Sequence, residues 1–258
     1  MMRERILQQL SSIERQEAVR IFYACESGSR AWGFASPDSD YDVRFLYARP
    51  LDWYFSITEG RDVIERPEDE LLDIGGWDIR KALRLLRKSN APLLEWIGSP
   101  VCYRSDDASL ALFRGLADRS FLPESSFRHY LAMANNSLEA MGSGTEVRTK
   151  AYLYATRTLL CCLWIERTGS RPPVQVSELI SGLLIGPDDA QVKGALESLI
   201  IKKQAGTEKA TIDRIPVLDG FLSRQIEVLA QVSPKVASLP PIEDFDGVFR
   251  AIVRQQWS

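Results

Sequence analysis

A Gly-Ser turn between two short apolar runs is the most constraining feature of this sequence. The first run, residues 21–25, is aromatic and β-branched, which predicts a buried strand. The second run, residues 41–47, has apolar residues at every second position, which is typical of a strand. Successive side chains of a strand point to opposite faces, so Asp40 and Asp42 are expected on one face. The segment therefore predicts a strand-turn-strand unit with two carboxylates at the mouth of its second strand.

The chemistry of this unit follows from its acids and its turn. Two carboxylates on one face repel each other unless a cation lies between them, and Mg²⁺ prefers hard oxygen ligands that it shares with substrate phosphates. The turn, Gly28-Ser29, is expected to open a short helix and to offer backbone N–H groups and a hydroxyl to a phosphate. Gly28 has no Cβ, so the backbone can approach a ligand closely. A phosphate cradle opposite a metal-binding acid pair suits phosphoryl or nucleotidyl transfer.

Turn chemistry is the competing explanation of these acids, because Asp and Ser are common in turns. It accounts for Asp38, which follows a proline in a Ser-Pro-Asp-Ser cluster. It accounts poorly for Asp40 and Asp42, since a solvated turn does not require a second carboxylate inside an apolar strand.

Composition excludes several classes of protein. The chain has 258 residues, enough for one large domain or two ordinary ones, and its 45% hydrophobic and 26% charged residues are typical of a globular protein. The net charge of −3 argues against non-specific electrostatic binding of nucleic acid by the whole protein. A local basic patch remains compatible with this charge. The N-terminus is expected to form a charged helix and not a signal peptide, and no apolar run approaches the ~20 residues of a membrane span.

The four cysteines match no zinc-binding spacing, so we expect reduced thiols in a cytoplasmic protein. They are Cys25, Cys102, Cys161 and Cys162. No membrane partner is expected, since no long apolar run is present.

The chain after the second strand is predicted to add a hairpin and then only helices. Two short strands are expected at residues 62–65 and 70–74, joined by a turn at residues 66–69 that contains a proline. The run Gly75-Gly76-Trp77 is expected to end the second of them, and Asp78 is a favoured N-cap for the helix that follows. Apolar periodicity predicts helices at residues 3–18, 79–89, 106–118, 124–141, 146–168, 188–203, 214–232 and 243–256.

A further acid lies within the predicted hairpin. Asp73 has apolar neighbours on both sides, where a lone carboxylate costs free energy unless it faces solvent or a ligand. It is either a third acid of the site or an edge-strand acid facing water, and Asp78 is the other acid that could complete the site. Lys81 is expected near Asp73 if the hairpin prediction is right, where it could face a triphosphate or nucleic acid.

These motifs resemble a known family. Gly-Ser, a spacer and Asp-x-Asp within a strand resemble the nucleotidyltransferase superfamily of DNA polymerase β. The longer runs at residues 28–33 and 39–44 resemble a narrower branch, the predicted nucleotidyltransferases of the YcgL type, also called RNA ligase-associated polymerases. Residues 76–96 and the run at residues 150–157 are similar to the same branch.

The resemblance implies an α+β fold and a metal-dependent activity. A polymerase-β-like mixed sheet with flanking helices would occupy residues 1–104, and an all-helical domain would occupy residues 105–258. Asp40 and Asp42 would hold Mg²⁺, two ions being expected and Mn²⁺ being a possible substitute. Asp73 fits the position of the superfamily's third carboxylate, as a general base or a metal ligand.

Nucleotide contacts are expected from Gly28, Ser29, Arg30, Lys81, Lys150 and Arg157. The last two lie in a helix that is otherwise strongly apolar, from which cations could neutralise a triphosphate across a cleft. A solvated basic face of that helix explains the same pattern equally well.

The predicted activity is transfer of a nucleoside monophosphate from an NTP to an acceptor hydroxyl, with release of pyrophosphate. The acceptor is left open: an RNA end, a protein side chain and a small molecule all fit the motif. The oligomeric state is also left open. Two other classes compete, an antitoxin-like or other regulatory partner protein and a nucleotide-binding sensor without transfer activity. The intact acid pair argues against an inactive enzyme.

Overall fold

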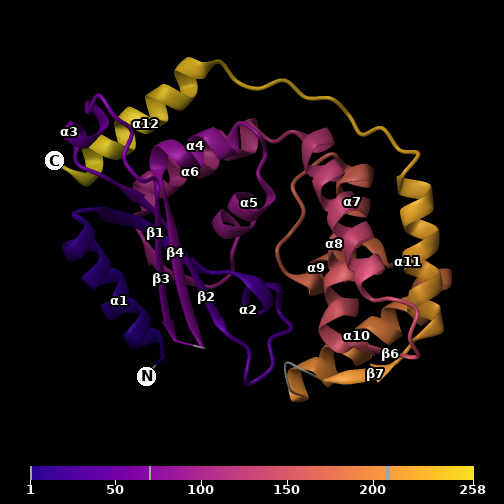
Figure 1. Ribbon diagram of the computed structural model, residues 1–258. Coiled ribbons are helices and arrows are strands. Elements are labelled where there is room, and N and C mark those ends of the chain that lie inside the picture. The colour runs from indigo at the N-terminus through magenta and orange to yellow at the C-terminus, as the bar shows by residue number, and fades with distance from the viewer. Residues whose placement is uncertain (1, 70, 207–209) are drawn as a thin grey trace. The chain divides into compact units, whose positions relative to one another are not determined.

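The protein is described here by a computed structural model that covers residues 2–69, 71–206 and 210–258 (Figure 1). The chain divides into two compact units. The first unit comprises Met1–Ala31, Asp40–Phe121 and Ser238–Ser258, and the second comprises Trp32–Ser39 and Leu122–Ala237. Two units were expected, but neither is contiguous and the main boundary is at residue 121 instead of 104.

A five-stranded mixed sheet forms the centre of the first unit, with the strand order β3-β4-β2-β1-β5. Its strands are β1 (Arg20–Glu26), β2 (Tyr41–Ala48), β3 (Val63–Asp69), β4 (Leu72–Asp78) and β5 (Cys102–Ser105). The pair β2–β4 is parallel, and the other neighbours are antiparallel. The mixed α+β fold predicted from the sequence is therefore confirmed, with β5 as a strand that the apolar pattern did not reveal.

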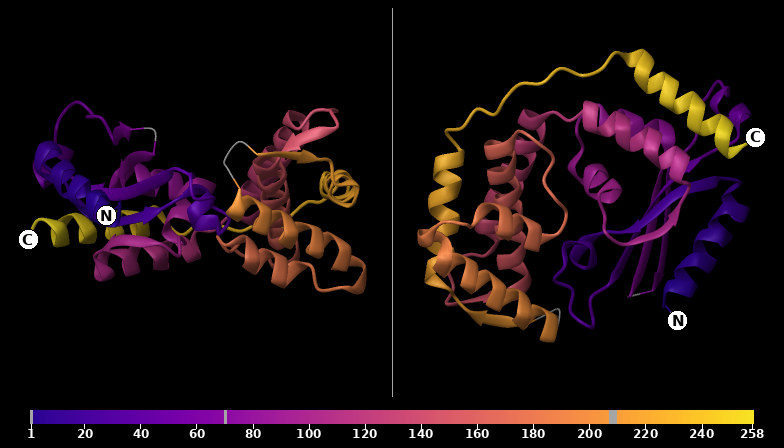
Figure 2. Two further views of the ribbon diagram at one scale, coloured as in Figure 1. Left: turned by 90° about the horizontal axis from the view of Figure 1, so that it is seen from below. Right: turned by 180° about the vertical axis from the view of Figure 1, so that it is seen from behind.

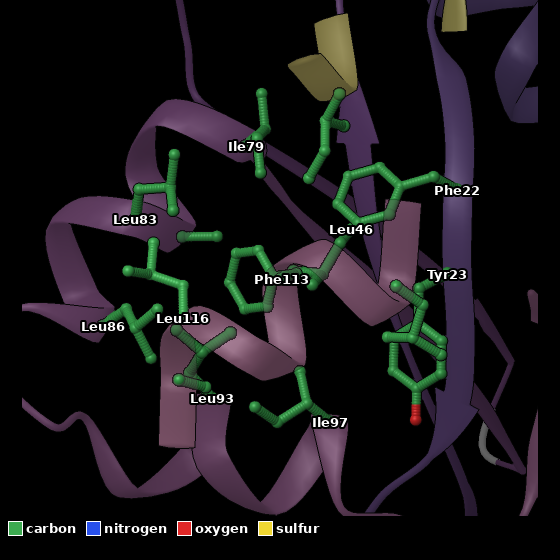
Figure 3. Close-up of a cluster of buried hydrophobic side chains, with 14 of the residues drawn as sticks. Phe22, Tyr23, Leu46, Ile79, Leu83, Leu86, Leu93, Ile97, Phe113 and Leu116 are labelled. Atoms are coloured by element: carbon green, nitrogen blue, oxygen red, sulfur yellow. The ribbon is translucent and has the colours of Figure 1, made fainter. Parts of the chain in front are cut away.

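Helices cover both faces of this sheet (Figure 1). On one face, α1 (Met2–Glu17) buries Ile6 and Leu10 against the sheet residues Val43 and Phe45. The opposite face packs against α4 (Ile79–Leu86), α5 (Ala91–Ile97), α6 (Asp107–Arg119) and α12 (Ile242–Gln256). Figure 3 shows part of this second core, in which aromatic and aliphatic side chains from strands and helices meet.

Packing explains why α6 and α12 belong to the first unit and not to a separate helical domain. Phe113 of α6 is fully buried and lies 6.4 Å from Phe22 of β1, measured between ring centroids. Phe245 and Ile252 of α12 are buried in the same cluster. The pair Phe22 and Phe113 is separated by 91 positions in the chain, and Phe245 lies further away still, so local periodicity does not report these contacts.

Strand β4 is longer than predicted and contains the two glycines that were expected to end it. The predicted turn at residues 66–69 is also wrong, because these residues belong to β3. Glu70, where the second strand was expected to begin, lies outside the described residues. Gly76 is buried under Phe45, so a glycine here marks close packing and not the end of a strand.

Gly76→Ala is expected to lower the free energy of unfolding by about 1–3 kcal/mol, because overpacked cores must shift to accept a methyl group. A Cβ at this position would lie well inside 3.0 Å of the buried Phe45 ring. Gly75→Ala is the matched control, since its Cβ would meet nothing closer than Arg44 Nη1 at 3.5 Å. Urea denaturation of both variants measures the difference, and equal losses would contradict this account of the glycine pair.

The second unit is mainly helical. Its helices are α7 (Pro123–Ala140), α8 (Thr149–Thr168), α9 (Val176–Leu183), α10 (Ala190–Ala205) and α11 (Pro216–Leu229), with a short 3₁₀ helix at Pro187–Asp189. Helix α8 packs against α7, α9, α10 and α11 and buries most of its side chains. These elements are seen from further directions in Figure 2.

Two details of this unit differ from prediction. A two-stranded antiparallel sheet joins β6 (Glu146–Arg148) to β7 (Thr211–Asp213), so the unit is not all-helical, and α8 begins three residues later than expected. Strands this short carry too little periodicity to be read from sequence. In the described ranges, no helix is both long and apolar enough to cross a membrane.

The segment Trp32–Ser39 leaves the Gly-Ser helix and packs with the helical unit. Trp32 meets Tyr154 of α8 edge-on, with ring centroids 4.9 Å apart. The ammonium of Lys203, buried in α10, donates to Ser36 Oγ over 2.7 Å. The spacer between the turn and the acid pair is therefore part of a different compact unit from the motifs it separates.

Candidate active site

The Gly-Ser turn lies directly against the strand that carries the acids. It opens the short helix α2 (Gly28–Trp32), as predicted, and Ser27 N donates to the carbonyl of Asp42 over 2.8 Å. Gly28 has a φ of +61°, and a Cβ there would overlap the Asp42 carboxylate. Glycine is required at this position both by the backbone conformation and by the carboxylate that fills the space of its missing side chain.

The parallel register of β2 and β4 places Asp42 beside Asp73. Paired residues of neighbouring strands point to the same face, so two carboxylates that are distant in sequence share one position on the sheet. The same register pairs Asp78 with Tyr47. Asp78 therefore lies roughly 16 Å along β4 from Asp73. Of the two acids left open by the sequence, Asp73 lies at the site.

Asp78 has a structural role at the other end of β4. It is fully buried, its Oδ1 accepts from Arg80 N over 2.8 Å, and its Oδ2 accepts from Tyr54 OH over 2.7 Å. The first bond is the N-cap of α4 that the sequence predicted. Burial raises the pKa of the Asp78 carboxyl, and the Tyr54 and Arg80 hydrogen bonds oppose this shift.

Arg44 bridges the two paired acids. Its Nη2 lies 2.7 Å from Asp73 Oδ2 and 3.3 Å from Asp42 Oδ1, and its Nη1 donates to the carbonyl of Val43 over 3.0 Å. Only 20% of the Arg44 side chain is exposed. The guanidinium thus offsets the repulsion between the two carboxylates and orients Asp73. Our sequence interpretation gave Arg44 no role, although its position two residues after Asp42 places it on the same face of β2.

Glu26 is a second residue that the interpretation missed. It is 1% exposed, its Oε1 accepts from the backbone N–H of Asp42 over 2.8 Å, and its Oε2 accepts from Tyr103 OH. Burial raises the pKa of the Glu26 carboxyl, the hydrogen bonds from Tyr103 and from Asp42 N oppose this shift, and the Asp42 charge adds to it. Glu26 therefore holds the backbone of β2 at Asp42 through this hydrogen bond. The antiparallel pairing of β1 with β2 brings Glu26 next to Asp42.

Arg30 and Asp40 lie at the entrance to β2. Arg30 Nε donates to the backbone carbonyl of Asp40 over 3.0 Å, and its guanidinium stacks on the Tyr41 ring at 3.7 Å from the centroid. Asp40 precedes the first residue of the strand and is exposed. Metal binding by Asp40 and nucleotide binding by Arg30 stay predictions.

Lys81 does not lie near Asp73, and that expectation was wrong. Because β4 continues to Asp78, the helix that follows starts at the opposite end of the strand from Asp73. Lys81 Nζ instead forms an ion pair with Asp62 Oδ1 at 3.1 Å. The error follows directly from the shortened prediction of β4.

Lys150 and Arg157 belong to α8 of the helical unit. Lys150 Nζ lies 5.4 Å from the centroid of the Tyr154 ring. Arg157 is 2% exposed, its guanidinium stacks on Trp32 at 4.3 Å, and its Nη2 donates to the carbonyl of Val174 over 3.4 Å. The solvated basic face considered for this helix does not apply to Arg157. Its contacts are those of a packing residue, and its contact with a nucleotide remains a prediction.

The acids provide hard oxygen donors of the kind that Mg²⁺ binds. Within the described part of the chain, no cluster of three or more His, Cys, Asp or Glu side chains is arranged to hold a metal. What the structure contains is a pair, Asp42 and Asp73, already bridged by the cationic group of Arg44. The carboxylate oxygens are donors of the class that Mg²⁺ binds, and metal binding by this pair stays a prediction.

Gly28→Ala is expected to reduce transfer far more than Ser29→Ala, because the new methyl group would displace the Asp42 carboxylate as well as strain the backbone. If Ser29 binds phosphate as predicted, removing its hydroxyl deletes one hydrogen bond worth about 0.5–1.5 kcal/mol, so a KM increase of roughly 2- to 12-fold is expected. Steady-state kinetics with varied NTP separates the two effects. Similar values for both variants would contradict the cradle.

The mixed sheet, the paired acids and the glycine turn beside them define a nucleotidyltransferase-like catalytic unit. A family model described as RlaP, RNA repair pathway DNA polymerase beta family, matches residues 2–251. The chain belongs to this family. This membership supports nucleotidyl transfer as the general class of activity.

Two individual proteins are also similar to the chain. The uncharacterized protein YcgL of Bacillus subtilis (strain 168) is 43% identical over 235 residues, which are 91% of this chain and 89% of the relative. A crystal structure of a nucleotidyltransferase-like protein from Exiguobacterium sibiricum 255-15 covers 97% of this chain and 77% of its own, with 14% identity and a TM-score of 0.30.

Proposed function

We propose that this protein is a magnesium-dependent nucleotidyltransferase that moves a nucleoside monophosphate from an NTP to an acceptor hydroxyl. One observation carries the proposal: Gly28 packs on the Asp42 carboxylate, and Asp42 is in register with Asp73. The turn proposed to bind phosphate is thus beside the two acids, although the segments that supply them are separated in sequence.

The chain's own groups have distinct roles in this proposal. Gly28 and Ser29 bind the β- and γ-phosphates, and Asp42, with Asp40 at the entrance of its strand, holds Mg²⁺. When bound, the ion neutralises phosphate charge and lowers the pKa of a coordinated hydroxyl. Asp73 accepts the proton of the acceptor hydroxyl. The acceptor oxygen forms a bond to the α-phosphorus, the bond from the α-phosphorus to the bridging oxygen breaks, and pyrophosphate leaves.

A divalent ion held by Asp42 would compete with Arg44 for that carboxylate. The shorter contact of Arg44 is with Asp73, at 2.7 Å against 3.3 Å for Asp42. Arg44 would therefore keep Asp73 oriented through its shorter contact while Asp42 holds the ion.

Incubation with each of the four NTPs, labelled at the α-phosphate, tests the proposal. The candidate acceptors are total RNA and a cell lysate, and the label is followed into RNA, protein and small molecules separately. We expect label in one acceptor class, dependent on Mg²⁺ or Mn²⁺ and absent with Asp42→Asn. NTP binding with no labelled product from any acceptor would favour the nucleotide sensor or the antitoxin-like regulatory protein instead.

A further inference from the structure

A groove of about 560 Å³ begins at Asp73 and runs along the partly exposed face of β4 that carries Gly75 and Trp77. Its lining includes Asp73 and Arg44 at one end and Trp77 and Trp96 at the other, with Gly75 between them. Asp73, Gly75 and Trp77 alternate along one strand, so they share a face. The volume is in the range of pockets that hold ligands of nucleotide size.

The position of the groove relative to the acids indicates which substrate it would take. Across the sheet, the Gly-Ser helix follows β1, Asp42 is on β2, Asp73 is on β4, and the groove extends over β4 and β3. The phosphate cradle and the groove therefore lie on opposite sides of the acid pair. Phosphoryl transfer places the attacking and leaving oxygens roughly in line, so the acceptor arrives from the side away from the pyrophosphate.

The lining indicates the chemistry of the ligand. The rings of Trp77 and Trp96 stack with centroids 3.8 Å apart and an interplanar angle of 31°. Trp96 is 5% exposed and fixes this platform, while Trp77 is more accessible. Gly75 adds no side chain of its own to the floor, and the Arg44 side chain lies beside it, with Nη1 3.5 Å from the position of a Cβ. An indole pair at the end of such a groove suits a planar ring such as a nucleobase.

A basic group also lines the groove. Arg61 forms an ion pair with Glu65 at 2.7 Å, and their side chains are 71% and 66% exposed. Exposed ion pairs of this kind contribute only about 0–1 kcal/mol, so Arg61 can exchange its partner for a phosphate at little cost. The groove thus combines an aromatic platform, an available cation and an acid that would accept the proton of a hydroxyl.

We infer that this groove binds the acceptor, and that the acceptor is the 3′ end of a single-stranded nucleic acid. The terminal hydroxyl would lie at Asp73, a base would stack at Trp77, and a backbone phosphate would meet Arg61. The inference rests on the proposed function for the role of Asp73. It goes beyond that function by giving the acceptor a class and a binding site.

The test measures binding of a short fluorescent single-stranded oligoribonucleotide with a free 3′ hydroxyl, in Mg²⁺ buffer without NTP. An oligodeoxyribonucleotide of the same sequence shows whether the ribose matters, and binding of either strand meets the expectation. Trp77→Leu should weaken binding roughly 5- to 150-fold, as expected for loss of one stacked base, whereas Trp77→Phe should keep most of the affinity.

Gly75→Leu provides a second variant that keeps both tryptophans in the chain. Its Cβ would meet nothing closer than Arg44 Nη1 at 3.5 Å, and its side chain would project from the strand into the groove, so binding should fall. Urea denaturation of the variant checks that it is folded. Unchanged affinity in both Trp77→Leu and Gly75→Leu, or no binding of either oligonucleotide to the wild type, would overturn the assignment.

The outcome can be separated from that of the proposed function. Asp42→Asn should still bind the oligonucleotide, because Asp42 does not line the groove. Oligonucleotide binding with no transfer of label to any acceptor would contradict the proposed function alone. Transfer to a protein or a small molecule by a protein that binds neither strand would contradict the groove assignment alone.

Discussion

Asp42→Asn is expected to reduce nucleotidyl transfer by about 10²-fold or more, because the amide cannot supply the charged oxygen that a divalent ion requires. Stability should change by no more than about 1 kcal/mol. The substitution weakens a 3.3 Å ion pair with Arg44, but it also removes a negative charge next to Glu26 and Asp73. The measurements are single-turnover rates and urea denaturation of the same preparations.

Asp38→Asn is the matched control, since Asp38 lies in the turn before the acid pair and is exposed. Its transfer rate should stay within about twofold of wild type, as expected for a surface substitution. Asp40→Asn should resemble Asp42→Asn in its loss of activity. A folded Asp42→Asn protein that retains full activity would rule out the metal-binding role.

Asp73→Asn is expected to lower kcat by about 10²- to 10⁴-fold while NTP and Mg²⁺ still bind, because a general base acts mainly in the transition state. The amide oxygen of Asn can still accept from Arg44, so the side chain should keep its position. With 51% of the Asp73 side chain exposed, the loss of charge should cost at most about 1 kcal/mol of stability.

The control for this prediction is Asp62→Asn, which removes an acid paired with Lys81 outside the site. Its turnover should be close to that of wild type. Equilibrium binding of NTP distinguishes the mechanism, because loss of NTP affinity in Asp73→Asn, with kcat unchanged, would assign Asp73 to substrate binding and not to proton transfer.

Local signals in the sequence were sufficient for the elements around the site. The strand at 41–47 appears as β2, and the turn at Gly28 opens a helix as expected. Alternation of side chains in a strand and capping by Asp78 depend on near neighbours in the chain, so both can be read from residue types and spacing.

Errors arose where a residue's role is set by a distant partner. Gly76 resembles a strand terminator, and only the buried ring of Phe45 beside it explains a glycine inside β4. Because the end of β4 was predicted too early, Lys81 was expected near Asp73, whereas it lies beyond the opposite end of the strand. The same lack of long-range information placed the C-terminal helix in a separate domain, whereas Phe245 is buried in the first core.

The sequence by itself determined the class of fold, the helix-opening turn at Gly28 and the strand that carries Asp42, because those features are carried by short stretches of chain. Only the tertiary structure decided that Asp73 and not Asp78 joins Asp42, since the choice depends on the parallel register of β2 and β4. It also decided that Arg44 bridges the acids. Register and bridging arise from pairing between strands that are about thirty residues apart, and no local pattern specifies which residues such pairing brings face to face.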